Sequence, residues 1–293
     1  MLRLDYRKQK ILIIFTFSFI PLLLLGVFSY YPALSLFHIS FTKWNGLDPV
    51  KTWVGLDNYR QVFSDPQIFG VFRHNLAYLI GSILQNIIAL LLAIVLNGKL
   101  RGRNLFRVII FLPFIMNNVA TAYMFSFVYD FQDGSLNTLL RAVGLEALAS
   151  RWLGDVNLVN YSLAAVSVWK YTGFTMVIYL GALQSIPSEL YEAARIDGAN
   201  APQLLRYITL PGIIKIIELN LFLTVSGALE VFELPFIMTG GGPGDASSTF
   251  VTKTVDTAFV FDNYGLASAM GVVLLILTVI VLGAQRLVLG RRE

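Results

Sequence analysis

The chain has 293 residues, of which 56% are hydrophobic and only 14% are charged, and its mean hydropathy is +0.68. Soluble globular domains carry about 25% charged residues, so this composition excludes an ordinary soluble domain and predicts a protein solvated mostly by lipid. The formal net charge of +4 does not indicate nucleic-acid binding, because the basic residues form short clusters beside apolar runs. The absence of cysteine excludes disulfides, thiol catalysis and thiolate metal sites.

The first apolar run, from Ile11 to Tyr31, follows a basic N-terminal tail formed by residues 1–10. About 20 apolar residues cross a hydrocarbon core of about 30 Å, so this run is long enough to span a membrane. No small-residue cleavage site follows it, and we therefore predict a retained transmembrane helix rather than a cleaved signal peptide. An extracellular loop is expected to follow at residues 32–75.

Five further segments have a similar length and apolar character: Leu76–Leu96, Leu105–Val128, Tyr161–Leu183, Gly212–Leu234 and Tyr264–Gln285. A helix satisfies every backbone polar group within itself, so the sequence predicts an all-α membrane protein with six transmembrane helices. Residues 76–285 are expected to form a five-helix core, and residues 286–293 a short tail. Pro113, followed by Asn117 and Asn118, predicts a kink in the third span.

The distribution of lysine and arginine predicts which loops face the cytoplasm. One set of loops is short and rich in basic residues, whereas the opposite set is longer and holds half as many. By the positive-inside rule, the basic set is cytoplasmic, and both termini then lie in the cytoplasm. An even number of spans agrees with this orientation.

The loop at residues 184–211 is the longest on the predicted cytoplasmic side. Its sequence contains residues that are typical of the start and of the end of a short helix. Pro187 suits a first helical turn, where its missing N–H would be unpaired in any case. Glu189 and Glu192 are favoured near the positive end of the helix dipole. Gly198 suits a C-terminal cap with left-handed backbone. A second short helix is expected from Pro202 to Pro211.

This loop has the properties of a docking element for another protein. Ala193 and Ala194 are small enough to let a partner approach the backbone closely, while Glu189, Glu192, Arg195 and Asp197 provide charges around such a contact. The alternative interpretation is an interfacial helix that only links two spans.

The segment Glu192-Ala193-Ala194, followed by Gly198-Ala199 and then by Ile208-Thr209-Leu210-Pro211, resembles the cytoplasmic signature of ABC importer permeases. The form found here is similar to that of the carbohydrate-uptake family. The outside motif Val54–Tyr59, the segment Thr239–Pro243 and the segment Tyr264–Met270 extend the resemblance to the maltose-permease-like first subunit of a permease pair.

The resemblance implies the type I ABC importer permease fold in a bacterial cytoplasmic membrane. It further implies a second homologous permease, a cytoplasmic ABC ATPase dimer, an extracellular or periplasmic solute-binding protein, and a sugar or oligosaccharide substrate. The residues expected to contact the ATPase are Glu189, Glu192, Ala193, Ala194, Arg195, Asp197, Gly198 and Ala199. Closure of the ATPase dimer on ATP would then drive alternating access of the permeases.

The chain itself lacks the chemistry of an enzyme. It contains no G-x-x-x-x-G-K-[ST] phosphate-binding loop, so we expect ATP and Mg²⁺ to be bound by the partner ATPase, and no cofactor by this chain. No pattern of catalytic residues is present. The two histidines, His38 and His74, lie far apart in the sequence, and we therefore expect no metal site.

Polar residues inside predicted spans are candidates for the substrate pathway, because charge at mid-membrane costs about 2.5–3.5 kcal/mol unless it lines a cavity or an interface. A sugar would need amide and hydroxyl partners and an aromatic ring. The candidates are Asn117, Tyr123, Trp169, Lys170, Tyr171, Asn220, Thr224 and Glu230. Packing against a neighbouring helix is the alternative role for each of them.

Import of a sugar is therefore the predicted function. A permease for another solute, such as glycerol phosphate, is an alternative, although Lys170 is the only clear cation within a span. An autonomous channel or secondary carrier is a second alternative, and it leaves the cytoplasmic loop unexplained. A membrane scaffold that transports nothing is a third.

Overall fold

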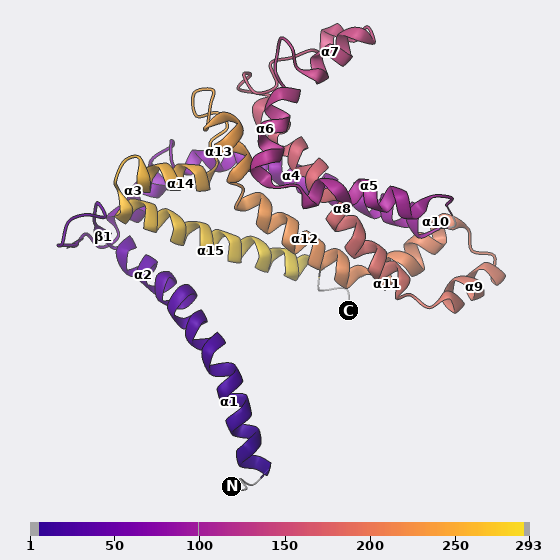
Figure 1. The fold of residues 1–293 in the computed structure, drawn as a ribbon, viewed down its shortest axis with the longest axis horizontal. Helices are drawn as coiled ribbons and strands as arrows, with labels where there is room; N and C mark the ends of the chain where they lie inside the picture. The colour runs from indigo at the N-terminus through magenta and orange to yellow at the C-terminus, as the bar shows by residue number, and fades with distance from the viewer. Residues whose placement is uncertain (1–5, 99, 290–293) are drawn as a thin grey trace. The chain divides into compact units, whose positions relative to one another are not determined.

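The computed structural model describes residues 6–98 and 100–289, and these are almost entirely helical (Figure 1). The chain forms two compact units. The first comprises the chain up to Asp65 together with Thr254–Leu275, and the second comprises Pro66–Lys253 with the chain from Ile276 onward. Helices α14 (Phe250–Phe259) and α15 (Tyr264–Leu289) contribute residues to both units.

The first unit begins with a long helical run formed by α1 (Tyr6–Leu25), the π-helical turn η1 (Gly26–Tyr30) and α2 (Tyr31–Ser40). This run continues nine residues beyond the predicted end of the first span at Tyr31. None of the residues of α1 is buried, and from Ile11 onward almost all of its side chains are apolar, as in a helix that faces lipid.

A small polar junction follows the long helix within the first unit. Strands β1 (Thr42–Lys43) and β2 (Thr52–Trp53) pair antiparallel, with Thr42 opposite Trp53, and α3 (Asp57–Ser64) comes next. The amide nitrogen of Asn58 donates to the carbonyl oxygens of Ser40 and Thr42, at 2.8 and 2.9 Å. Asn58 therefore ties α3 to the end of α2, which gives a structural reason for the polar outside motif Val54–Tyr59.

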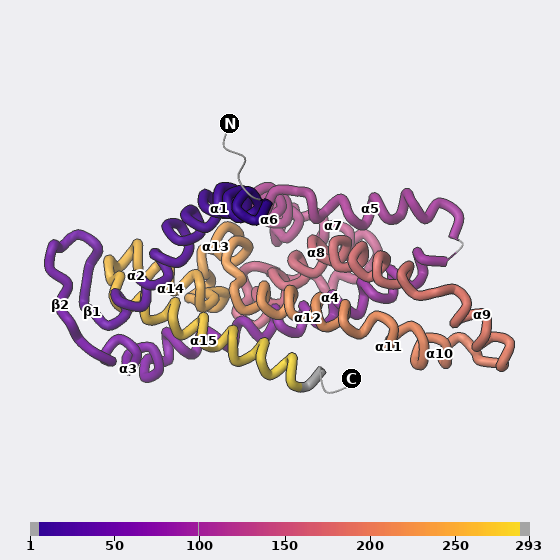
Figure 2. Tube along the Cα trace, turned by 90° about the horizontal axis from the view of Figure 1, so that it is seen from below, coloured from indigo at the N-terminus to yellow at the C-terminus, as the bar shows by residue number. Residues whose placement is uncertain are grey.

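The second unit is built on two long helices, α4 (Phe72–Asn97) and α8 (Val159–Gln184), which run parallel and lie side by side in both ribbon and tube views (Figures 1 and 2). Helix α5 (Arg103–Ile115) packs on α8, and α12 (Ile214–Leu229) packs on α4. Small residues permit these contacts. A Cβ atom at Gly173 of α8 would lie 2.0 Å from the carbonyl oxygen of Ile110 in α5.

The third predicted span is broken rather than bent. Helix α5 ends at Ile115, α6 (Asn118–Val128) begins after two residues, and the two axes differ by 99°. The prediction of a kink near Asn117 is confirmed, but its size was not predicted. The fifth span is also interrupted, because α12 ends at Leu229 and α13 (Glu233–Thr239) starts a new helix.

The remaining helices are short: η2 (Phe69–Val71), α7 (Ser135–Ala142), η3 (Glu146–Leu148), α9 (Ser188–Ile196), α10 (Ala201–Leu204), η4 (Leu205–Thr209) and α11 (Leu210–Gly212). Among the described residues, five helical segments are long and apolar enough to cross a membrane, or six if α5 and α6 count as one span. The all-α fold is thus confirmed.

Candidate coupling loop and transport cavity

Helix α9 ends in a Schellman motif, which explains why glycine occupies position 198. The N–H of Gly198 donates to the carbonyl of Arg195 at 3.1 Å, and the N–H of Ala199 donates to that of Ala194 at 2.9 Å. This pair of hydrogen bonds forms only when the residue after the helix has a left-handed backbone conformation, and the φ angle of Gly198 is +86°. The predicted cap is therefore confirmed. Pro187 lies one residue earlier than predicted, at the N-cap of α9 rather than in its first turn.

The second half of the loop is a continuous helical stretch with a strong start signal. The side chain of Asn200 accepts from the backbone of Gln203, and the side chain of Gln203 accepts from the backbone of Asn200, which forms a capping box. The helix does not stop at Pro211 as predicted. It passes through the π-helical turn η4 and ends at Gly212.

Two hydroxyl groups join the halves of the loop, since the Tyr191 hydroxyl lies 3.0 Å from the Thr209 hydroxyl. This contact holds α9 beside the second helix. The four predicted charged residues of α9 and its cap, Glu189, Glu192, Arg195 and Asp197, are all exposed. Ala193 is exposed as well, whereas Ala194 and Ala199 are half-buried by the cap.

The most exposed large apolar side chain of the loop is one that the sequence reasoning did not select. Ile196 is 87% exposed at the end of α9, and Leu190 on the same helix is 52% exposed. Isolated apolar residues at a surface are ordinary, but here two of them accompany three exposed charges on one nine-residue helix and a fourth at its C-cap. Figure 1 places α9 at one extremity of the second unit, beyond the ends of α8 and α11.

A cavity of about 500 Å³ lies among α4, α8, α12 and α13 in the second unit. Four of the eight predicted pathway residues line it: Tyr171, Asn220, Thr224 and Glu230. Its walls also include residues that were not on the list of candidates, among them Tyr78, Gln85, Phe174 and Glu233. Tyr78 and Gln85 were not selected because they lie in the predicted span Leu76–Leu96, which contains no charged residue.

A network of side-chain hydrogen bonds joins the helices around this cavity, and Gln85, Thr175 and Thr224 of the network line it. Asn86 of α4 donates to the Thr224 hydroxyl of α12 at 2.8 Å, and it accepts from the Tyr179 hydroxyl of α8 at 2.7 Å. Gln85 donates to the Thr175 hydroxyl at 2.8 Å. The three helices around the cavity are therefore joined by polar contacts as well as by apolar packing.

The other predicted pathway residues have different surroundings. The ammonium of Lys170, only 2% exposed, donates to the Met116 carbonyl and, at 3.3 Å, to the Thr121 hydroxyl. Asn117 caps α6 by accepting from the backbone of Val119. Both residues thus serve the break between α5 and α6, and neither lines the cavity.

The two remaining aromatic candidates also lie outside this cavity. Tyr123 is 59% exposed on α6. Trp169 packs edge-on against Phe125 and lines a second, largely apolar cavity of about 540 Å³ among α4, α5 and α8. Glu233, in contrast, accepts from Asn118 beside the break, and Tyr171 contacts the same asparagine at 3.4 Å.

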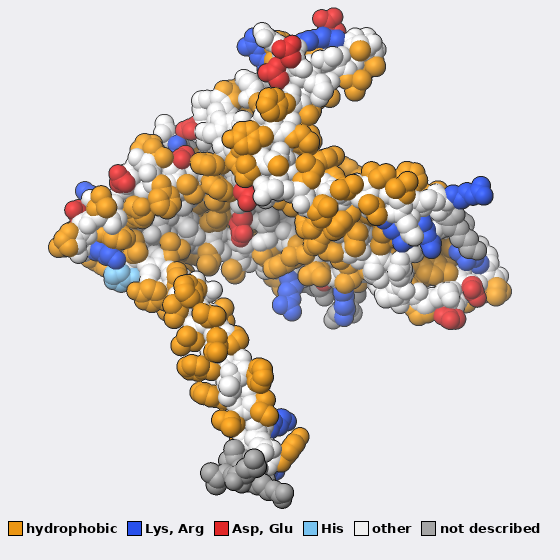
Figure 3. Space-filling model, viewed as in Figure 1, with side chains coloured by type: hydrophobic (Ala, Val, Ile, Leu, Met, Phe, Trp, Pro, Cys, Tyr) orange, Lys and Arg blue, Asp and Glu red, His pale blue; other side chains and the backbone are white. Residues whose placement is uncertain are grey.

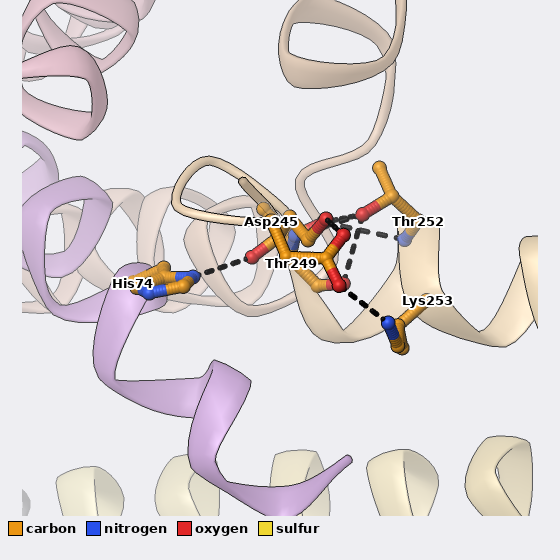
Figure 4. Close-up of polar contacts among 6 residues, drawn as sticks. His74, Asp245, Thr249, Thr252 and Lys253 are labelled. Carbon is orange, nitrogen blue, oxygen red and sulfur yellow. Dashed lines mark hydrogen bonds and ion pairs between the residues drawn. The ribbon is translucent and has the colours of Figure 1, made fainter. Parts of the chain in front are cut away.

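Hydrogen bonds and an ion pair hold the loop before α14 in the second unit (Figure 4). A ring nitrogen of His74 lies 2.8 Å from the Ser248 carbonyl, and Lys253 donates to the carboxylate of Asp245 at 2.8 Å. The hydrogen bond from Lys253 is the main cause that lowers the pKa of the Asp245 carboxyl below its ordinary value. The Thr249 hydroxyl donates to the Val231 carbonyl, which links the loop to the segment between α12 and α13.

Comparison with known families shows the family of this chain. Residues 85–293 match the model of the family described as the inner membrane component of binding-protein-dependent transport systems. The chain belongs to this family.

Relatives of known sequence match nearly the whole chain. The probable ABC transporter permease protein YurN of Bacillus subtilis is 38% identical, over 88% of this chain and 90% of the relative. The multiple sugar-binding transport system permease protein MsmF of Streptococcus mutans is 30% identical, over 91% of each. A chain of a bacterial ABC transporter that imports the acidic polysaccharide alginate has the same fold, with a TM-score of 0.85, 23% identity and 97% of both chains covered.

Proposed function

We propose that this chain is one of two membrane-spanning permeases of a bacterial ABC importer that takes up a sugar or oligosaccharide. Membership of the inner-membrane-component family supports the role in transport. The nearly full-length relationship to MsmF, a multiple-sugar permease, supports a sugar as the cargo. A cavity lined by amide, hydroxyl, carboxylate and aromatic side chains agrees with that cargo.

The observation that carries the proposed coupling is the exposed helix α9, held by its Schellman cap and by the Tyr191–Thr209 contact. We infer that α9 inserts into a cytoplasmic ABC ATPase, with Ile196 as an apolar anchor and Glu192, Arg195 and Asp197 as its charged surroundings. ATP and Mg²⁺ are then bound by that ATPase, because this sequence has no phosphate-binding loop of its own.

Transport then proceeds by alternating access. A solute-binding protein delivers the sugar from outside, and closure of the ATPase dimer on ATP is transmitted through α9 to the second unit. Both termini and the loop that contains α9 face the cytoplasm in this proposal, in agreement with the basic residues of these regions.

The substitution Ile196→Asp tests the coupling. The side chain of Ile196 is almost fully exposed, so the substitution leaves the fold intact while placing a charge in the proposed apolar contact. We expect at least a tenfold reduction in ATPase co-purified with the chain, together with loss of ATP-dependent uptake of radiolabelled oligosaccharides in proteoliposomes.

The matched control is Val143→Asp, which follows α7 and is 60% exposed at a site far along the chain from α9. This variant should retain ATPase and uptake. Normal ATPase binding and uptake by the Ile196→Asp variant would contradict the coupling proposal. Uptake that proceeds without ATP in the parent complex would instead identify an autonomous carrier.

A further inference from the structure

The charged side chains that line the 500 Å³ cavity are all acidic among the residues that the structure describes there. Glu230 and Glu233 contribute two carboxylates, and the lining includes no lysine, arginine or histidine. Lys170 is buried outside the lining and donates to Met116 and Thr121 at the helix break, and its charge interacts with that of Glu233. Glu230 has no such cationic neighbour in the lining. Figure 3 shows acidic side chains on the second unit, over the region where α6, α12 and α13 meet.

A second, independent feature of the same cavity points to a ligand. The side chain of Asn220 lines the cavity and is only 1% exposed, yet its amide nitrogen makes no hydrogen bond of normal geometry among the described residues. The Tyr179 hydroxyl is its one polar neighbour among them, and it can satisfy at most one of the two N–H donors. Buried donors are almost always paired in folded proteins. The neighbouring amide of Asn86 illustrates this, since it donates to both Ser82 and Thr224. The amide of Asn220 is therefore available for an oxygen atom of a molecule in the cavity.

These groups fit the chemistry of a sugar hydroxyl. A hydroxyl group both donates and accepts, so it pairs equally well with the carboxylates of Glu230 and Glu233 and with the amide of Asn220. The rings of Tyr171 and Phe174 also line the cavity and offer surfaces for a sugar ring. A carboxylate on the sugar would only accept, and the two glutamates would repel it.

We propose that this cavity selects against acidic sugars, and that Glu230 and Glu233 restrict the cargo to uncharged or amine-bearing sugars. This inference rests on the proposed function, sugar import, and specifies its substrate class. It also distinguishes this chain from the alginate transporter of the same fold, whose cargo is an acidic polysaccharide.

The sign of the charge in the cavity can be measured without knowing the cargo. Because the chain has no cysteine, a single Gly227→Cys substitution places one thiol in the cavity. A Cβ atom at Gly227 meets no other atom within 4 Å, so the thiol has room. The rates of its reaction with cationic trimethylammonioethyl and anionic sulfonatoethyl methanethiosulfonate are compared in the reconstituted complex, with mass spectrometry of this chain as the readout.

Using the ratio of the two rates removes the effect of the carboxylates on the reactivity of the thiol itself, because both reagents attack the same thiolate. A Gly70→Cys thiol in η2, also in open space and outside the cavity, gives the reference ratio. We expect the cationic reagent to be favoured at position 227 by about tenfold over this reference. The change Glu230→Gln with Glu233→Gln should return the ratio to the reference.

Two further variants secure the interpretation. Glu218→Gln lies on the same helix α12 but outside the cavity, and it should leave the ratio unchanged. Glu230→Gln alone should lower the ratio, and it avoids the contact between Glu233 and Asn118 if the double variant fails to fold. A ratio at or below the reference, or one that neither substitution alters, would overturn the inference.

The outcome is independent of whether the chain imports sugars. A cation-selective cavity in a complex that takes up no sugar would contradict the proposed function and leave the charge of the cavity established. Sugar uptake by a complex whose cavity shows no preference for the cationic reagent would contradict this inference alone.

Discussion

Several buried or half-buried polar residues of this chain donate to backbone carbonyls at the end of a neighbouring helix. Asn75 donates to the carbonyls of Ala228 and Leu229 at the end of α12, at 3.0 and 3.2 Å. Arg107 donates to the carbonyl of Leu96 at the end of α4, at 2.7 Å. Helix ends leave carbonyls without intrahelical partners, and such carbonyls are costly to bury in lipid. Polar residues within spans therefore serve the broken helices as well as the cavity.

Lys170 provides a direct test at the residue scale. Replacing it by methionine keeps the length of the side chain but leaves the Met116 carbonyl and the Thr121 hydroxyl without their donor. We expect a loss of stability of about 1–3 kcal/mol, the usual cost of unpairing buried polar groups. Thermal unfolding of the purified complex in detergent measures it. The control Tyr171→Phe removes only one contact of 3.4 Å and should reduce the stability much less. Equal stability of the Lys170→Met variant and the parent would refute the role of Lys170 at the helix break.

The Asp245–Lys253 pair predicts a pH dependence of the loop before α14. The folded state lowers the pKa of Asp245, so the pair stabilises the loop at pH values above the unfolded pKa of about 4. That contribution is lost as the pH falls through the lowered pKa. Because the carboxylate is 62% exposed, screening by solvent keeps the effect below about 1 kcal/mol.

Hydrogen exchange of the amides of residues 240–253, corrected for intrinsic rates, measures this opening as a function of pH. Lys253→Met should remove most of the dependence below pH 4. An unchanged pH profile in that variant would show that the pair does not hold the loop.

At the scale of elements, the contact between α5 and α8 depends on one glycine. A Cβ atom at position 173 would lie 2.0 Å from the Ile110 carbonyl oxygen and 2.7 Å from the Phe111 Cα atom, and both are backbone atoms. Neither can move without shifting α5. Small residues that let helix backbones approach closely are typical of interfaces between membrane helices.

The substitution Gly173→Ala is therefore expected to destabilise the chain by about 1–3 kcal/mol or more, the range seen for overpacked cores. Gly181→Ala on the same helix α8 is the matched control, because a Cβ atom there meets nothing within 4 Å and alanine favours a helix by about 1 kcal/mol. Thermal unfolding of both complexes should separate the two variants in opposite directions. Similar melting temperatures would show that α5 yields to the extra methyl group.

At the scale of the whole molecule, the 99° break between α5 and α6 decides the topology. If the two helices form one span, the chain crosses the membrane six times; if they re-enter on one side, it crosses five times. With six crossings, the basic loop between α4 and α5 and the loop after α6 lie on opposite sides of the membrane. With five crossings, the two loops lie on the same side.

We predict six crossings, because they bring both the basic loop before α5 and the basic loop that contains α9 to the cytoplasm. In the cysteine-free chain, single cysteines at Leu100 and Leu145, which are 44% and 49% exposed, report the two loops. A membrane-impermeant thiol reagent added to intact cells should label position 145 and not position 100. Labelling of both positions, or of neither, would indicate a re-entrant pair.

The sequence by itself determined the all-α membrane fold and the cap at Gly198, because segment length, hydropathy and local hydrogen bonding are properties of adjacent residues. Only the tertiary structure decided which polar side chains line the cavity. Tyr171 lines the cavity and Lys170, one residue away, does not, since successive residues point to different faces of α8. The break near Asn117 was visible locally, but its 99° geometry involves Lys170, more than fifty residues further along the chain.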